Sequence, residues 1–206
     1  MTRAIGILFL FCACAVAAPP AGYYSNAVGK TGQELRAALH GIISQGHVPI
    51  DYEDDARSAI EVLDQDPANP NNVWLLYAQR TEPKTNYDPG IGWNIEHLWP
   101  VSYGLTNKGP YYSDLHHLRA ESSQANSSRG NKLFDETSPI QECWVPSNQY
   151  APLCSSDCNS WEPPAVVKGD IARSLFYMDV RYATGPGWET NLMLTDIVSE
   201  STVKRT

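Results

Sequence analysis

The sequence has no apolar run long enough to span a membrane as a helix. The apolar run from Ile5 to Val16 follows the basic Arg3 and ends in small residues, which is typical of a secretory signal peptide. We predict cleavage after Ala17, so that residues 1–17 are the signal peptide. Residues 18–206 then form one domain, secreted to the cell exterior or the periplasm without a membrane anchor.

Basic residues are scarce. The chain has 15 Lys and Arg against 23 Asp and Glu, a formal net charge of −8. This excludes attraction of a polyanion by overall charge, although phosphate contacts usually dominate nucleic-acid affinity. Acidic residues are concentrated between positions 51 and 66, which predicts a solvated surface. A local basic groove on an acidic protein remains open, formed by Lys108, Arg119, Arg129 and Lys132.

Cysteine is also scarce. Of five cysteines, Cys12 and Cys14 leave with the signal peptide, which excludes a scaffold held by many disulfides. Three remain in an oxidising compartment, so one is left over. The favoured pairing is Cys143–Cys154, which would close a proline-rich loop, and Cys154–Cys158 is the alternative. A zinc site at these cysteines is disfavoured because no histidine is nearby.

The apolar pattern predicts a mixed α+β domain with short elements and many loops. A capping box from Thr31 to Glu34 precedes a helix over 32–45. Another helix begins near 121–126, with Ser122 or Ser123 as its cap. The remaining predicted elements are a short helix over 57–63, buried strands over 73–78 and 93–98, and a last helix that begins after Pro163-Pro164 and continues to Tyr182.

The segments GWNIEHLWPVSYG and SDLHHLRAESSQANSSRGNKLFDE gather ionisable and amide side chains in one short span. Phosphodiester hydrolysis at neutral pH needs a base, a divalent cation and a cationic clamp, and this span offers all three. His97 is the candidate base, and Glu96 is the candidate ligand for Mg²⁺. Adjacent residues of an ideal strand face opposite sides, so both reach one site only beyond a distorted strand end. Pro100 makes such an end plausible.

Further side chains of this span complete the candidate site. Asn126 offers a neutral amide oxygen for the Mg²⁺ shell, and Arg119 and Arg129 are candidates for holding a phosphate by bidentate hydrogen bonds. The roles of Asp114, His116 and His117 stay open between structural and chemical. A zinc site made by His116, His117 and Glu121 is an alternative, although no HExxH or HxxEH pattern is present.

The ordered set WNIEHLWPVS and SDLHHLRAESSQANSSRGNKLF resembles the endonuclease I family of secreted bacterial nucleases, which belongs to the ββα-metal (His-metal finger) group. WEPPAVVKGDIARSLFYMDVRY looks like the C-terminal helical segment of that family, and the similarity covers roughly residues 70 to 185. This resemblance implies that His97 is the general base and that Glu96 and Asn126 are the metal ligands. It also places Arg129 and Asn131 in the recurring RGN element of the family.

The resemblance further implies a small ββα-metal core packed among several helices. It implies a Mg²⁺-dependent endonuclease, with Mn²⁺ as a substitute, that cleaves DNA and also RNA without sequence specificity and leaves 5′-phosphate ends. We expect a monomer. The proteobacterial secreted forms are rich in cysteine, so the departure of this chain leaves its disulfide pattern open. The alternatives are a zinc-dependent hydrolase that uses His116, His117 and Glu121, or a secreted nucleic-acid-binding protein without catalysis.

Overall fold

A computed structural model describes residues 18–106, 109–182 and 192–194. The predicted signal peptide and the end of the predicted last helix segment, Thr184-Gly-Pro-Gly, lie outside the described residues. The described residues confirm a mixed α+β architecture with small sheets. The helices are α1 (Gly32–Ser44), α2 (Arg57–Leu63), α3 (Ser123–Arg129) and α4 (Lys168–Arg181). The strands are β1 (Gln65–Asp66), β2 (Asn69–Trp74), β3 (Thr81–Pro83), β4 (Trp93–His97), β5 (Leu118–Ser122), β6 (Leu133–Phe134), β7 (Ser155–Ser156) and β8 (Ser160–Glu162).

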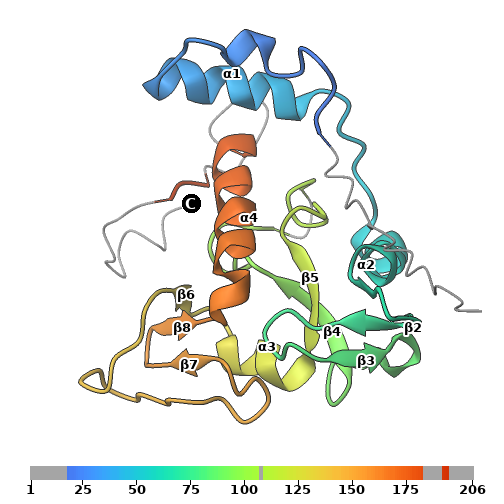
Figure 1. Cartoon of the computed structure of the whole chain (residues 1–206), viewed down its shortest axis with the longest axis vertical. Coiled ribbons are helices and arrows are strands. Elements are labelled where there is room, and N and C mark those ends of the chain that lie inside the picture. The colour runs from blue at the N-terminus through green and yellow to red at the C-terminus, as the bar shows by residue number, and fades with distance from the viewer. Residues whose placement is uncertain (1–17, 107–108, 183–191, 195–206) are drawn as a thin grey trace, which may run out of the picture.

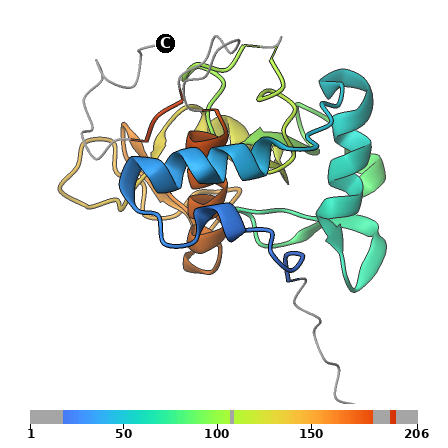
Figure 2. The same cartoon turned by 90° about the horizontal axis from the view of Figure 1, so that it is seen from above.

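Helix α4 runs through the middle of the molecule, and the small sheets lie around it (Figure 1). Helix α1 crosses the end of α4, as the view from above shows (Figure 2). The two helices are joined by an ion pair in which Arg36 Nη1 lies 2.6 Å from Asp179 Oδ2. The sheets have the strand orders β1-β2-β3, β4-β5 and β6-β8-β7. Among the described residues, no helix is both long and apolar enough to cross a membrane.

The apolar clusters explain why these elements pack together. One cluster joins α2 to the β4–β5 sheet and contains Ile60, Trp93 and Ile95. Another joins the third sheet to α4, around the fully buried Trp161. Burial of large aromatic rings supplies much of the apolar area removed from water. The β4–β5 sheet is therefore held in place by its packing against α2.

The predicted helices over 32–45 and 57–63 are confirmed as α1 and α2. The capping box at Thr31 is not formed, because the Thr31 side chain makes no capping hydrogen bond. The predicted strand over 73–78 is wrong beyond Trp74, because β2 ends there and a turn follows. Apart from the exposed Trp74 the run is nevertheless buried, so its apolar character reflects core packing rather than a continuous strand.

Strands β4 and β5 form an antiparallel pair that leads directly into α3. The register places Glu96 opposite Arg119 and His97 opposite Leu118. The Ser122 hydroxyl oxygen accepts a hydrogen bond from the Ala125 amide, which confirms a serine cap at the start of this helix. The pattern predicted β4 but missed β5, since Arg119 and Glu121 interrupt its apolar residues.

The disulfide joins Cys143 to Cys158, so the predicted pairing of Cys143 with Cys154 is wrong. Cys154 is a buried free thiol in the same apolar cluster as Trp161. Its side chain faces the core, whereas Cys143 and Cys158 meet across the loop, where the Cys158 amide donates to the Glu142 carbonyl. The bonded pair and the buried thiol leave no set of three thiolates for the zinc alternative at these cysteines.

Candidate active site

A pocket of about 230 Å³ lies between the end of β4 and the C-terminal half of α3. We call it the β4 pocket. It brings together the three residues predicted to carry the chemistry, although Asn126 is about thirty positions from the other two. Its lining residues are Ile95, Glu96, His97, Pro100, Val101, Ser102, Asn126, Gly130 and Asn131. The pocket lies at the strand end, the location that lets two adjacent residues reach one site.

Glu96 is almost fully buried and is bound from two sides. Its Oε1 accepts a hydrogen bond from the Tyr77 hydroxyl at 2.6 Å and one from Arg129 Nη1 at 2.9 Å. Burial raises the pKa of Glu96, while the Arg129 charge and the Tyr77 hydroxyl act in the opposite direction. Because an opposite charge lies in contact, we take the pair as ionised. Both bonds use Oε1, so neither occupies Oε2.

His97 is the last residue of β4, and its ring packs against both Tyr52 and Tyr112. Its Nε2 lies 2.9 Å from the Tyr112 carbonyl oxygen. A carbonyl only accepts hydrogen bonds, so Nε2 carries the proton and Nδ1 carries the lone pair. Burial lowers the pKa of His97 to about 4, against a smaller opposing effect of the Tyr112 hydrogen bond. The ring is therefore neutral at neutral pH and is held in one tautomer.

Asn126 lies on α3 with its amide nitrogen turned toward β4. Its Nδ2 donates to Asn94 Oδ1 at 3.0 Å and lies 3.3 Å from the Ile95 carbonyl oxygen. The amide oxygen is consequently the atom left to face the β4 pocket. A carboxylate and an amide oxygen in one pocket suit a hard cation, and Mg²⁺ commonly takes only one or two protein ligands beside water and phosphate. The residues present therefore fit a magnesium ion.

The two arginines predicted to hold phosphate lie in different environments. The Arg129 side chain is only 1% exposed, and its guanidinium donates to Glu96 and to the carbonyls of His97, Leu98 and Lys132. These internal bonds do not support the prediction that Arg129 clamps a phosphate. Arg119 lies opposite Glu96 in the sheet register but lines other pockets, not the β4 pocket. Their nearness to the motif in the sequence did not show that these two arginines lie in different environments.

The zinc alternative would require His116, His117 and Glu121 to meet, and the structure does not bring them together. His116 is exposed, with Nδ1 2.9 Å from Asp114 Oδ1. His117 is fully buried with Nε2 2.8 Å from the Tyr111 carbonyl oxygen. Glu121 is buried beside the Tyr77 amide, and burial raises its pKa to about 8. The described residues contain no group of three or more His, Cys, Asp or Glu that could hold a metal ion.

Sequence reasoning missed three residues that support the site. Tyr77 supplies the hydroxyl that binds Glu96, Tyr112 supplies the carbonyl that orients His97, and Asn94 positions the Asn126 amide. A weak signal existed for Tyr77, because it carries the only hydroxyl in the apolar run from Val73 to Ala78. No signal pointed to the Tyr112 carbonyl, since a main-chain group has no mark in the sequence.

Comparison with known proteins defines the class. The model of the Endonuclease I family matches residues 31–203, and the chain belongs to this family. The match confirms the resemblance found in the motifs. The chain is 46% identical over 169 residues to an extracellular ribonuclease of Bacillus amyloliquefaciens. It is 45% identical over 169 residues to an extracellular ribonuclease of Bacillus subtilis (strain 168).

These alignments cover 81% of this chain but 55% of each relative, so the chain spans about half the length of the relatives that it matches. Both relatives are named extracellular, in agreement with the predicted secretion.

Proposed function

We propose that this protein is a secreted, metal-dependent endonuclease that hydrolyses phosphodiester bonds of RNA and DNA without sequence specificity. The observation that carries this proposal is the convergence of Glu96, His97 and Asn126 on the β4 pocket. Strands β4 and β5 with helix α3 would form the ββα-metal core of residues 18–206, the predicted nuclease domain. The names of the two ribonuclease relatives support RNA as one substrate.

Glu96 and Asn126 would hold one Mg²⁺, with Mn²⁺ as a substitute. When bound, the ion supplies positive charge that stabilises the phosphate and the departing 3′ oxygen in the transition state. Arg129 is a positioning residue in this proposal, because its guanidinium fixes Glu96 and the carbonyls of His97 and Leu98 at the strand end. The Tyr77 hydroxyl donates to the same carboxylate oxygen as Arg129.

His97 acts as the general base. Its protonated Nε2 is bound to the Tyr112 carbonyl, so Nδ1 accepts the proton of the attacking water. The lowered pKa, about 4, keeps the ring neutral and ready to accept that proton at neutral pH. Attack of this water on phosphorus and departure of the 3′ oxygen yield a 5′-phosphate end. Contacts of this kind are made to the backbone and carry no base information, which explains the absence of sequence specificity.

The test is cleavage of supercoiled plasmid and of single-stranded RNA with a series of divalent metals. We expect cleavage with Mg²⁺ and Mn²⁺ and none after EDTA. His97→Ala should lower the rate by about 10²- to 10⁴-fold while nucleic-acid binding persists. His40 on α1 is the matched control, because it lies outside the β4 pocket and bonds to Val180.

Three outcomes distinguish the candidate functions. Cleavage by His97→Ala at the parent rate would refute the mechanism. Binding without cleavage at any Mg²⁺ or Mn²⁺ concentration would favour a non-catalytic binding protein. Activity that depends on stoichiometric zinc and on His116 would favour the other hydrolase.

A further inference from the structure

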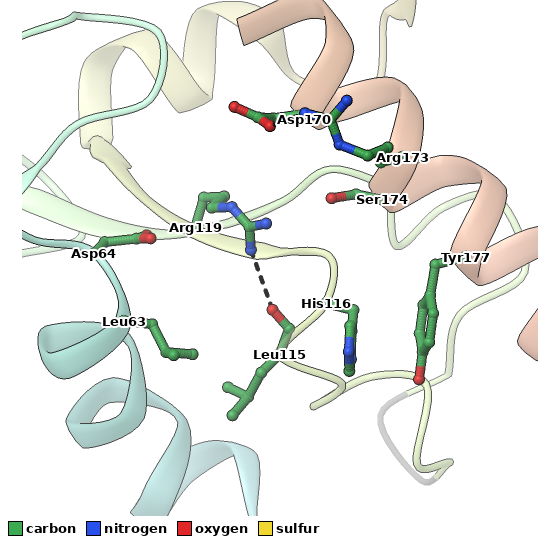
Figure 3. Close-up of a pocket in the computed structure, with 9 residues that line it drawn as sticks. All are labelled: Leu63, Asp64, Leu115, His116, Arg119, Asp170, Arg173, Ser174 and Tyr177. Atoms are coloured by element: carbon green, nitrogen blue, oxygen red, sulfur yellow. Dashed lines mark hydrogen bonds and ion pairs between the residues drawn. The ribbon is translucent and has the colours of Figure 1, made fainter. Parts of the chain in front are cut away.

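A second and larger pocket, of about 550 Å³, lies beside α4 (Figure 3). We call it the His116 pocket. It contains none of the residues of the β4 pocket. Figure 3 shows His116 and Tyr177 side by side at one end and Arg119 across the opening. The lining residues are Leu63, Asp64, Leu115, His116, Arg119, Asp170, Arg173, Ser174 and Tyr177.

His116 and Tyr177 form a stacked aromatic platform. Their ring centroids are 4.0 Å apart and their planes differ by 16°. Both rings are anchored to the buried Asp114, whose Oδ1 accepts from His116 Nδ1 and whose Oδ2 accepts from the Tyr177 hydroxyl. The His116 side chain is nevertheless 66% exposed. One face of the imidazole is therefore covered by Tyr177, and the ring is held in a fixed orientation while much of it remains open to a ligand.

Arg119 offers a cation across the pocket from this platform. Its Nη1 donates to the carbonyls of Leu115 and Leu118, which fixes the guanidinium beside the pocket. Both bonds use Nη1, so Nη2 and Nε keep donors that a phosphate can accept from. Arg119 lies directly opposite Glu96, and opposed Cα atoms of an antiparallel pair are about 5 Å apart. The His116 pocket and the β4 pocket therefore flank one two-stranded sheet.

The charge of this pocket is balanced rather than basic. Arg173 is paired with Asp170, and Asp64 lies on the same wall as Arg119. The pocket therefore has no net positive charge that would bind an anion by electrostatic attraction alone. An aromatic platform with a single fixed arginine suits a flat base attached to a phosphate. Bases are open to such stacking in single strands but not inside a duplex.

We propose that the His116 pocket binds one nucleotide of a single-stranded substrate, with its base stacked on His116 and its phosphate at Arg119. The inference rests on the proposed nuclease function and adds a substrate subsite to it. A neighbouring pocket shares Leu115, His116 and Tyr177 and reaches Tyr23 and Tyr24. The bound strand can therefore continue past the platform toward these exposed rings.

The test measures binding of a short, fluorescein-labelled single-stranded RNA by anisotropy, in the His97→Ala background with EDTA. His116→Ala and Arg119→Gln should each weaken binding at least about fivefold, as expected for loss of base stacking or of a phosphate contact. His116→Phe keeps an aromatic face and should restore binding to within about twofold of the parent. Circular dichroism of each variant verifies the fold.

Two control variants remove an aromatic ring or an arginine that does not line the His116 pocket. Phe176→Ala removes an exposed ring adjacent to Tyr177 that does not line the pocket. Arg80→Gln removes an exposed arginine that is paired with Glu82. Both should bind the RNA like the parent. Salt dependence separates the two roles, because only phosphate contacts contribute to the slope of log affinity against log salt concentration. His116→Ala should leave this slope nearly unchanged, whereas Arg119→Gln should lower it by about one phosphate contact.

Unchanged binding by His116→Ala and Arg119→Gln would overturn the subsite, as would weak binding by His116→Phe. Competition by double-stranded RNA as strong as that by single-stranded RNA would also overturn it. None of these results bears on cleavage. Failure of the proposed function would appear separately, as absence of plasmid and RNA cleavage by the parent protein at any metal concentration.

Discussion

The β4 pocket and the His116 pocket flank the same two-stranded sheet but are built on opposite principles. In the β4 pocket Glu96 and His97 are buried, 2% and 8% exposed, and they bond to other buried side chains and to the main chain. In the His116 pocket the His116 ring is exposed, whereas its anchor Asp114 is buried. Reacting groups need fixed geometry and low dielectric, whereas a binding platform needs access.

The two pockets also differ in size and in the partners of their arginines. The β4 pocket has a volume of about 230 Å³ and the His116 pocket about 550 Å³. Arg129 uses its donors inside the protein, while Arg119 uses one nitrogen for anchoring. Two arginines ten positions apart thus have different tasks: one orients protein groups, and the other is available to a ligand.

The largest expected effect is loss of the buried pair at the β4 pocket. Arg129→Met leaves the Glu96 carboxylate buried without its cation, so unfolding free energy should fall by about 3–5 kcal/mol. Arg129→Lys keeps the charge but loses the planar guanidinium, so its unfolding free energy should lie between those of the parent and Arg129→Met. Urea denaturation measures the change. Arg80→Met, at an exposed pair, should cost at most about 1 kcal/mol, and an equal loss in both variants would contradict the contrast.

The second prediction concerns the anchor of the His116 pocket. Burial raises the pKa of Asp114, but hydrogen bonds from His116 and Tyr182 outweigh it, and the net pKa is well below its usual range. A lowered pKa stabilises the fold above the ordinary value of about 4 and loses that contribution as pH falls below it. Asp114→Asn should therefore cost about 2–3 kcal/mol at neutral pH.

The difference between parent and Asp114→Asn should narrow as the pH is lowered below about 4, and denaturation curves at several pH values measure it. The same variant should weaken binding of single-stranded RNA, because Tyr177, on which the His116 ring stacks, loses its carboxylate partner. A constant difference in unfolding free energy across this pH range would show that the carboxylate charge is not what stabilises the platform.

The smallest expected effect comes from the cap of α3. Ser122→Ala removes the hydroxyl that accepts from the Ala125 amide and should cost about 1 kcal/mol. Since α3 carries Asn126, the concentration of Mg²⁺ needed for half-maximal cleavage should rise modestly. Ser128→Ala is the matched control on the same helix, because its hydroxyl bonds only to the Gln124 carbonyl. RNA binding at the His116 pocket should not change in either variant.

The sequence alone determined the class of the protein and the residues proposed for the chemistry. The spacing of the Glu-His pair and the later Asn carried the resemblance to the nuclease family, and the helices α1 and α2 followed from apolar periodicity. Strand β4 was also predictable, because its alternate residues Trp93 and Ile95 pack in the core. These signals are local, so a linear pattern can record them.

Only the tertiary structure decided which partner each polar group has. It paired Cys143 with Cys158, buried Arg129 against Glu96, and directed Arg119 to a different pocket. It also fixed the tautomer of His97 through a main-chain carbonyl and separated His116 from the adjacent His117, one exposed and one buried. Such choices depend on contacts between segments far apart in the chain, where burial and hydrogen-bond satisfaction determine the outcome and residue type alone does not.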